Sequence, residues 1–154
     1  MTINTGDTRG AVMVEYLIAF LPVLLLFASG WQLADLYASQ LIVARAASAA
    51  GRAATVVLPD DPYYYDGAEV DSFTGARRSQ IILAAELVLQ ASPRILGNPT
   101  VDITGASGIG PLTATVVANY RCFPGWGVAV CGADGRVSVT GRADYPYHGA
   151  TYQY

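Results

Sequence analysis

The stretch YLIAFLPVLLLFASGWQLA, residues 16–34, contains nineteen residues without a charge and decides the first half of the fold. At a rise of about 1.5 Å per residue, a helix of this length measures roughly 28 Å, close to the hydrocarbon thickness of a bilayer. Its centre, residues 21–27, is apolar on every side, whereas a buried helix of a soluble protein normally keeps a polar face. The stretch therefore predicts a membrane-spanning segment.

The composition of the whole chain fits one small anchored domain. Its 154 residues are enough for a single domain, or for a membrane helix that carries one. Apolar residues make up 53% and charged residues 14%, which excludes intrinsic disorder. The net charge is −3, all cationic side chains are arginines, and no basic cluster exceeds the pair Arg77-Arg78. We therefore expect no nucleic-acid partner.

A second helix is predicted directly after the apolar stretch. Residues 35–57 are rich in alanine, which has the highest helix propensity. Ala46, Ala50 and Ala54 form a stripe at intervals of four residues, and such small residues let backbones approach closely. Two interpretations are open: the stripe packs against helices of other subunits, or the helix lies on its own domain.

The composition changes at residue 58, because seven of the eight prolines and twelve of the sixteen glycines follow it. Residues 58–75 are predicted as a surface loop, and their five acidic residues lack the spacing of an EF-hand. Helical periodicity over residues 76–92 ends at Ser92-Pro93. Alternating apolar residues then predict strands at 99–105, 112–122 and 136–144. We expect an α+β fold, in which the long N-terminal helix precedes one helix and three or four antiparallel strands.

The two cysteines suggest one disulfide. Cys122 and Cys131 bracket eight residues, and a bond between them is expected if this part of the chain is exported. The alternative is two free thiols in a reducing compartment. Together with the single histidine, His148, they cannot complete a four-ligand zinc shell without carboxylates, so no metal site is expected. No cofactor is expected either. No acid and nucleophile are marked beside His148, so the sequence gives no indication of an enzyme.

The N-terminus carries a carboxylate in an unusual place. Residues 1–9 are mostly polar, Gly10 follows them, and Glu15 lies where the apolar helix begins. An acidic side chain at the centre of a membrane helix costs about 2.5–3.5 kcal/mol on insertion scales, so it normally has a partner. Cleavage after Gly10 would give Ala11 a free α-ammonium group four residues before Glu15. The two charges can pair within one subunit or between neighbours.

The residues RGAVMVEY, 9–16, resemble the processing site of type IV prepilins, in which a glycine precedes the cut and glutamate is the fifth mature residue. The pair Glu15-Tyr16 resembles the Flp and TadE-like branch of the tight-adherence systems, as do the run LPVLLL and the Ala-rich helix. Flp major pilins are typically much shorter than this chain, so the tail favours a TadE-like pseudopilin. The resemblance is specific over residues 9–56, and beyond them only the order of elements matches.

The resemblance implies a division into a leader (1–10), a pilin-type helix (11–57, with 11–34 in the membrane) and a surface domain (58–154). A prepilin peptidase would cut between Gly10 and Ala11, and Glu15 would neutralise the new terminus. The subunit would lie in the bacterial inner membrane with its domain in the periplasm, and later in a filament at the cell surface. The implied partners are other pilin subunits, the peptidase, the inner-membrane assembly platform and lipid.

Pro22 departs from an unbroken helix, because it removes the hydrogen bond to the carbonyl of Ile18 and favours a kink. Neighbouring groups make such a residue tolerable in membranes. Local melting there would lengthen the subunit during assembly.

Other interpretations of the chain are open. Within the family, it is a minor pseudopilin or a major subunit with an enlarged surface domain. Outside it, the chain is a single-pass periplasmic binding module. The apolar stretch could also be a signal anchor or a secretory signal peptide cut near residues 27–30, although Glu15 is wrong for a signal peptide. Seven tyrosines form a contact surface or simply cover the sheet: Tyr63, Tyr64, Tyr65, Tyr145, Tyr147, Tyr152 and Tyr154.

Overall fold

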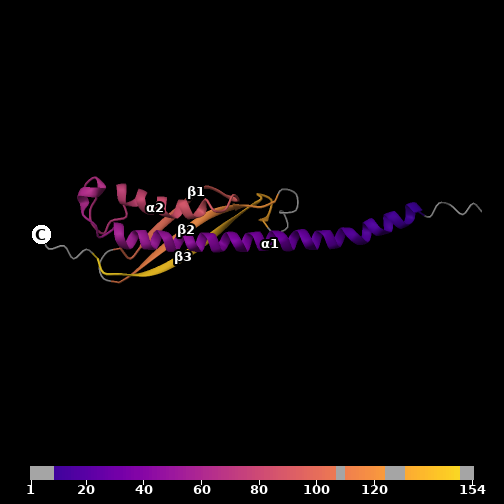
Figure 1. The fold of residues 1–154 in the computed structure, drawn as a ribbon, viewed down its shortest axis with the longest axis horizontal. Coiled ribbons are helices and arrows are strands. Elements are labelled where there is room, and N and C mark those ends of the chain that lie inside the picture. Colours follow the sequence, from indigo (N-terminus) through magenta and orange to yellow (C-terminus); the bar gives the residue numbers. More distant parts are fainter. Residues whose placement is uncertain (1–8, 107–109, 124–130, 150–154) are drawn as a thin grey trace, which may run out of the picture.

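The computed structural model of the chain describes residues 9–106, 110–123 and 131–149. Figure 1 shows one long helix that runs beside a small domain and projects beyond it at the N-terminal end. The architecture is α+β, as predicted. In chain order the elements are α1 (Arg9–Val57), the 3-10 helix η1 (Pro62–Tyr65), α2 (Gly75–Leu89), β1 (Ile95–Thr104), β2 (Gly110–Arg121) and β3 (Arg136–Tyr147).

The long helix α1 contains both the apolar segment and the Ala-rich segment, in agreement with the long N-terminal helix of the predicted fold. It contains 49 residues, and it continues without interruption through Pro22 and across the boundary between residues 34 and 35. The projecting part bends away from the axis of the remainder in Figure 1. The apolar stretch and the Ala-rich stretch are therefore one rod.

The three strands form an antiparallel sheet in the order β1-β2-β3. Both helices cover the same face of it, with α1 across β2 and β3 and α2 against β1 (Figure 1). The alternation in the sequence correctly identifies the inward residues of the first two strands. These buried side chains are Val101, Ile103, Leu112, Ala114, Val116, Ala118 and Tyr120.

The boundaries of the elements differ from the predicted ones for local reasons. Strand β1 begins before residue 99, because an irregularity between Leu96 and Thr100 accommodates Gly97, whose φ is +77°. Strand β3 extends beyond residue 144 and includes Pro146, which an edge strand tolerates because its N–H need not enter the ladder. Helix α2 ends at Leu89, three residues before the predicted end, and η1 lies within the predicted loop.

The alanine stripe faces the domain of its own chain. Ala46, Ala50 and Ala54 are completely buried against the sheet and α2, which decides between the two interpretations of the stripe. Two glycines make this close approach possible. A Cβ on Gly51 would lie 2.5 Å from the ring of Tyr145, and a Cβ on Gly141 would overlap the backbone of α1 at residue 43.

The C-terminal end of α1 is held by a buried arginine. The guanidinium of Arg77, from α2, donates to the carbonyl oxygens of Val57 and Leu58 at this helix end, and to those of Asp60 and Ala68 in the following loop. It also stacks on a ring, that of Tyr65, at 4.5 Å. The last carbonyls of a helix lack partners within the helix, so the side chain of Arg77 caps α1. It also holds the following loop against the end of the helix.

Candidate functional site: the projecting helix and its attachment

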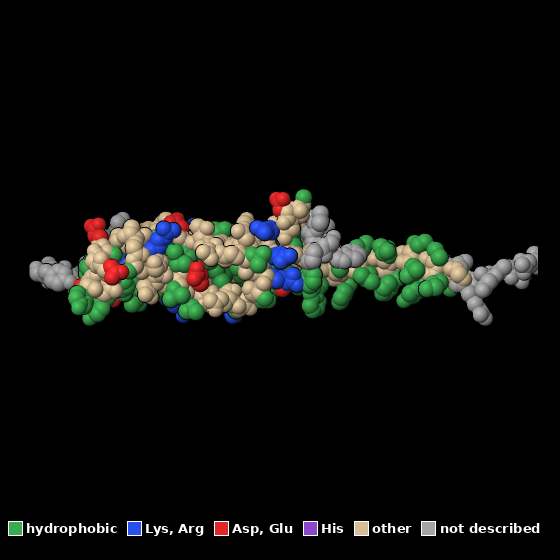
Figure 2. Space-filling view, turned by 90° about the horizontal axis from the view of Figure 1, so that it is seen from above, with side chains coloured by type: hydrophobic (Ala, Val, Ile, Leu, Met, Phe, Trp, Pro, Cys, Tyr) green, Lys and Arg blue, Asp and Glu red, His purple; other side chains and the backbone are tan. Residues whose placement is uncertain are grey.

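The projecting part of α1 is apolar and exposed. From Val12 to Trp31 every residue is exposed except Ala28, which is half-buried. The exposed fractions of its large side chains reach 75% at Leu26. Figure 2 shows hydrophobic side chains covering the visible face of this segment. The helix is long and apolar enough to cross a membrane, and its most apolar window is not buried inside the domain.

The predicted processing and assembly residues lie on this projecting segment. Helix α1 begins at Arg9, so the bond between Gly10 and Ala11 lies in its first turn, whereas residues 1–8 of the predicted leader lie outside the described residues. Glu15 is exposed and forms no ion pair within the described part of the chain. Positions 11 and 15 share a helix face, because residues four apart are neighbours. Next to Glu15, the ring of Tyr16 stacks on that of Phe20 at 5.6 Å.

The attachment to the domain begins one residue after Trp31. Gln32 is only 2% exposed, and its Nε2 donates to Sγ of Cys131 over 3.5 Å. Cys131 is bonded to Cys122, which confirms the predicted disulfide and joins the chain after β2 to the turn before β3. The first buried contact of α1 is therefore with the segment that this disulfide holds.

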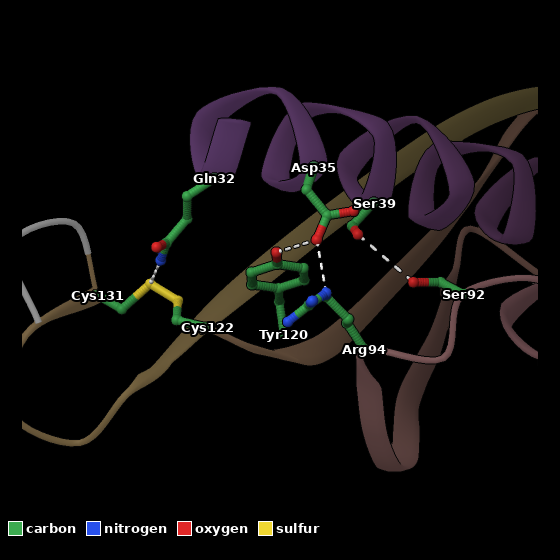
Figure 3. A network of polar contacts seen from close by, with 8 residues as sticks. All are labelled: Gln32, Asp35, Ser39, Ser92, Arg94, Tyr120, Cys122 and Cys131. Carbon is green, nitrogen blue, oxygen red and sulfur yellow. Dashed lines mark hydrogen bonds and ion pairs between the residues drawn. A yellow bond between two sulfur atoms is a disulfide. The ribbon is translucent and has the colours of Figure 1, made fainter. Parts of the chain in front are cut away.

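One helical turn further on, Asp35 is the centre of a polar network (Figure 3). Its carboxylate lies 2.7 Å from Nε of Arg94 and accepts a hydrogen bond of 2.7 Å from the hydroxyl of Tyr120. Burial raises the pKa of Tyr120 to about 12, and the hydrogen bond to Asp35 and its negative charge add to the effect. The guanidinium of Arg94 also stacks on the ring of Phe123 at 3.7 Å.

Further polar contacts follow along α1 at intervals. The hydroxyls of Ser39 and Ser92 lie 3.4 Å apart, and those of Ser48 and Tyr145 lie 2.5 Å apart. Because these contacts are spread along α1 and reach different parts of the domain, they fix the rotation of α1 about its own axis. The direction in which the projecting half leaves the domain is thereby fixed too.

Sequence reasoning found the residues of the projecting segment and missed those of the attachment. Gln32, Asp35, Arg94 and Tyr120 belong to no local motif, and Asp35 and Tyr120 are 85 positions apart. The only signal in the sequence is that Asp35 is the first charge after the apolar stretch.

Among the described residues, the tyrosines that the sequence offers as a contact surface or as cover for the sheet differ in their surroundings. Tyr63 and Tyr64 are exposed on η1, whereas Tyr147 is buried and donates to Asp71. Tyr145 packs on α1 at Gly51. Tyr152 and Tyr154 lie outside the described residues.

Comparisons of the chain with models of protein families, with curated proteins and with solved structures find no match. A functional assignment therefore depends on the exposed apolar segment, the residues that it carries and the way it is attached.

Proposed function

We propose that this protein is a membrane-anchored, pilin-like subunit of a tight-adherence, type IV-related filament, and specifically a minor pseudopilin. It acts by assembly with other subunits and has no catalytic step. One observation carries the proposal. A single helix contains an apolar segment that is exposed along almost its whole length, with Glu15 five residues after Gly10, and continues directly into a segment packed on a folded domain.

The dimensions of the projecting segment support insertion in a bilayer. The twenty residues from Val12 to Trp31 span roughly 30 Å as a helix, which matches one hydrocarbon core. The disulfide between Cys122 and Cys131 suits an oxidising compartment such as the periplasm. The proposed location is accordingly the bacterial inner membrane, with the domain on the periplasmic side.

The position of Glu15 supports assembly through the N-terminal helices. An exposed carboxylate such as that of Glu15, which has no ion-pair partner among the described residues, is unfavourable in an apolar environment. Removal of residues 1–10 would supply the α-ammonium group of Ala11 as a partner. When the ammonium of one subunit pairs with Glu15 of its neighbour, the pair sets the axial register between them.

The first test is the intact mass of the protein purified from the membranes of its own host. We expect the mass of residues 11–154, because the peptidase removes the leader after Gly10. A chain that retains Met1 would instead be a signal anchor, and a chain cut near residues 29–30 would be a secreted domain. Either of these masses contradicts the filament proposal.

The second test separates assembly from simple anchoring. Glu15→Ala is expected to leave membrane insertion intact and to abolish filaments, seen by electron microscopy of sheared cell surfaces. Glu86→Ala, on α2 of the domain, removes the same charge elsewhere and serves as the matched control. Filaments that form normally with Glu15→Ala would refute the pairing. The number of copies of the protein per filament distinguishes a minor from a major subunit. A minor subunit is required in far fewer copies than the filament has subunits.

A further inference from the structure

Arginine side chains gather at the end of the domain from which the projecting helix emerges (Figure 2). They come from three places in the chain. Arg94 precedes β1, Arg121 ends β2 and Arg136 begins β3. The sheet brings them together, since Arg121 lies directly opposite Arg136 in the register and its N–H donates to the carbonyl oxygen of Arg94 over 2.9 Å. We call these three residues the arginine end.

The arginine end contains an unfavourable pair. Arg121 and Arg136 are both exposed, and like charges directly opposite one another destabilise a sheet. Within the described residues neither of them forms an ion pair. Two acids lie nearby: Asp35 is already paired with Arg94, and Asp134 is exposed in the turn before β3. A partner that carries negative charge would relieve the repulsion.

The arginine end lies at the level where α1 leaves the domain. Arg121 is followed by Cys122, whose disulfide partner Cys131 contacts Gln32 of α1. The preceding residue, Trp31, is 63% exposed. Exposed tryptophans at the ends of apolar helices locate the boundary between bilayer and water. With Trp31 at that boundary, the guanidinium groups of Arg121 and Arg136 are at the depth of the lipid headgroups.

We infer that the arginine end binds the phosphate headgroups of anionic lipids in the leaflet that faces the domain. Guanidinium groups suit this ligand, because they are always charged and present several N–H donors to phosphate oxygens. The inference rests on the membrane-anchored stage of the proposed function. It adds a partner and a docked orientation: the domain stands on the membrane with its arginine end down and η1 at the far end.

The arginines reach the membrane by folding and not by position in the sequence. Basic residues orient an inserting helix when they lie within about 15–20 residues of its ends. The three arginines of the arginine end are much further along the chain, so they do not influence the orientation in which the helix inserts. The protein can thus place positive charge on the outer side of the membrane without reversing its own insertion.

The test is lipid binding by the full chain in a neutral detergent, measured by native mass spectrometry. Phosphatidylglycerol is the anionic probe and phosphatidylcholine the zwitterionic one. We expect apparent dissociation constants about tenfold lower for phosphatidylglycerol, as two unpaired arginines near a lipid phosphate imply. Arg121→Gln with Arg136→Gln should remove this preference, and the two corresponding lysine substitutions should largely keep it.

A matched control removes the same charge elsewhere. Arg45 and Arg78 are exposed and lie outside the arginine end, so Arg45→Gln with Arg78→Gln should leave the preference unchanged. Melting curves in the same detergent show that each variant is folded. Equal affinity for the two lipids overturns the inference, as does a preference that survives the loss of Arg121 and Arg136. Displacement of phosphatidylglycerol by an equal concentration of inorganic phosphate would mean a site for free anions, which also overturns it.

The lipid-binding test and the test of the filament proposal can fail separately. A chain cut after Gly10 that shows no preference for phosphatidylglycerol keeps the proposed function and loses the lipid site. A chain that binds phosphatidylglycerol through Arg121 and Arg136 but retains Met1 keeps the lipid site and loses the filament.

Discussion

The projecting half of α1 (residues 12–31) and its packed half (residues 32–57) are both apolar helix, yet only the packed half contains buried residues. The two halves differ in the size of their side chains. The projecting half has leucine, valine and phenylalanine on all sides, and none of its residues is buried. The packed half has alanine and glycine on the face that contacts the sheet. Hydrophobicity alone does not select a partner for a helix. Small side chains admit a sheet at close range, whereas large ones on every side fit a surrounding of lipid or of other helices.

The contrast appears in the spacing of the buried residues. In the packed half the buried positions recur at intervals of three, four or seven residues, with two adjacent pairs at 46–47 and 50–51, which traces one face. They are Gln32, Ser39, Val43, Ala46, Ala47, Ala50, Gly51 and Ala54. The two members of this face nearest to the projecting half, Gln32 and Ser39, are polar, and they form hydrogen bonds where the apolar half ends. The following predictions test this division from the largest expected effect to the smallest.

Arg77→Met should destabilise the domain most, because it leaves the carbonyls at the end of α1 buried without donors. We expect a loss of about 3–5 kcal/mol in the free energy of unfolding, measured by denaturant titration with near-ultraviolet circular dichroism in detergent. Arg78→Met is the matched control, since Arg78 is exposed and lies over the ring of Phe73. Equal losses for the two variants would refute the capping role of Arg77.

Gly141→Ala should cost about 2–3 kcal/mol, because the added methyl group overlaps the backbone of the packed half of α1. Gly30→Ala makes the same change in the projecting half, where nothing lies within 4 Å of the new Cβ. The domain of that variant should unfold at the same denaturant concentration as the parent. If both variants unfold alike, close approach of β3 to α1 is not what selects glycine at 141.

Tyr120→Phe should cost about 1.5 kcal/mol at neutral pH, because it removes a hydrogen bond to the charged Asp35. It should also change how the free energy of unfolding depends on pH in the alkaline range. Since the pKa of Tyr120 is about 12 in the folded chain and ordinarily about 10, the unfolded chain loses this proton first as the pH rises. Stability therefore falls between pH 10 and 12.

Denaturant titrations of the parent and of Tyr120→Phe between pH 8.5 and 11.5 measure this fall in the free energy of unfolding with pH. The variant should show a smaller decline, with a residual part from Tyr147, whose pKa is also raised, by burial and by its hydrogen bond to Asp71. Tyr64→Phe, at an exposed position, is the control. Parallel declines in the parent and in Tyr120→Phe would contradict the assignment.

Leu26→Ala should have the smallest effect on the domain, below about 0.5 kcal/mol, since Leu26 is 75% exposed. The same substitution at the completely buried Leu112 should cost about 2–5 kcal/mol. Denaturant titrations of both variants in one detergent make the comparison. A large effect at Leu26 would mean that the projecting half packs on the domain in solution.

Periodicity and composition were enough to predict the helices, the three strands and the inward residues of the sheet. They were also enough for the disulfide, because Cys122 and Cys131 flank one connection. The union of the two helical segments into α1 was predicted only through the resemblance to pilins, because composition and periodicity alone describe an apolar segment followed by an Ala-rich one. The irregularity at Gly97 and the strand residue Pro146 were missed because both residue types usually end strands.

The attachment site could not be predicted, for a physical reason. Asp35, Arg94 and Tyr120 meet only after the sheet has formed and α1 has packed on it, and nothing local specifies such pairs. The direction of the alanine stripe was open for the same reason, because small residues suit a neighbouring helix and the sheet of the same chain equally well. In contrast, Gly10 and Glu15 stand in a local pattern, and the sequence alone suffices to propose their roles.

The continuity of α1 has a mechanical consequence. A pull on the projecting half is transmitted through α1 to the packed half, which lies alongside the sheet for most of the length of the domain (Figure 1). The force therefore loads the contacts at Gln32, Asp35 and Ser39 and those near Gly141 in shear, so that they must yield together and not one after another. At the other end of α1, the hydrogen bonds of Arg77 to the last carbonyls also resist displacement of the helix. Resistance to a lengthwise pull on α1 thus comes from many contacts of the folded domain at once.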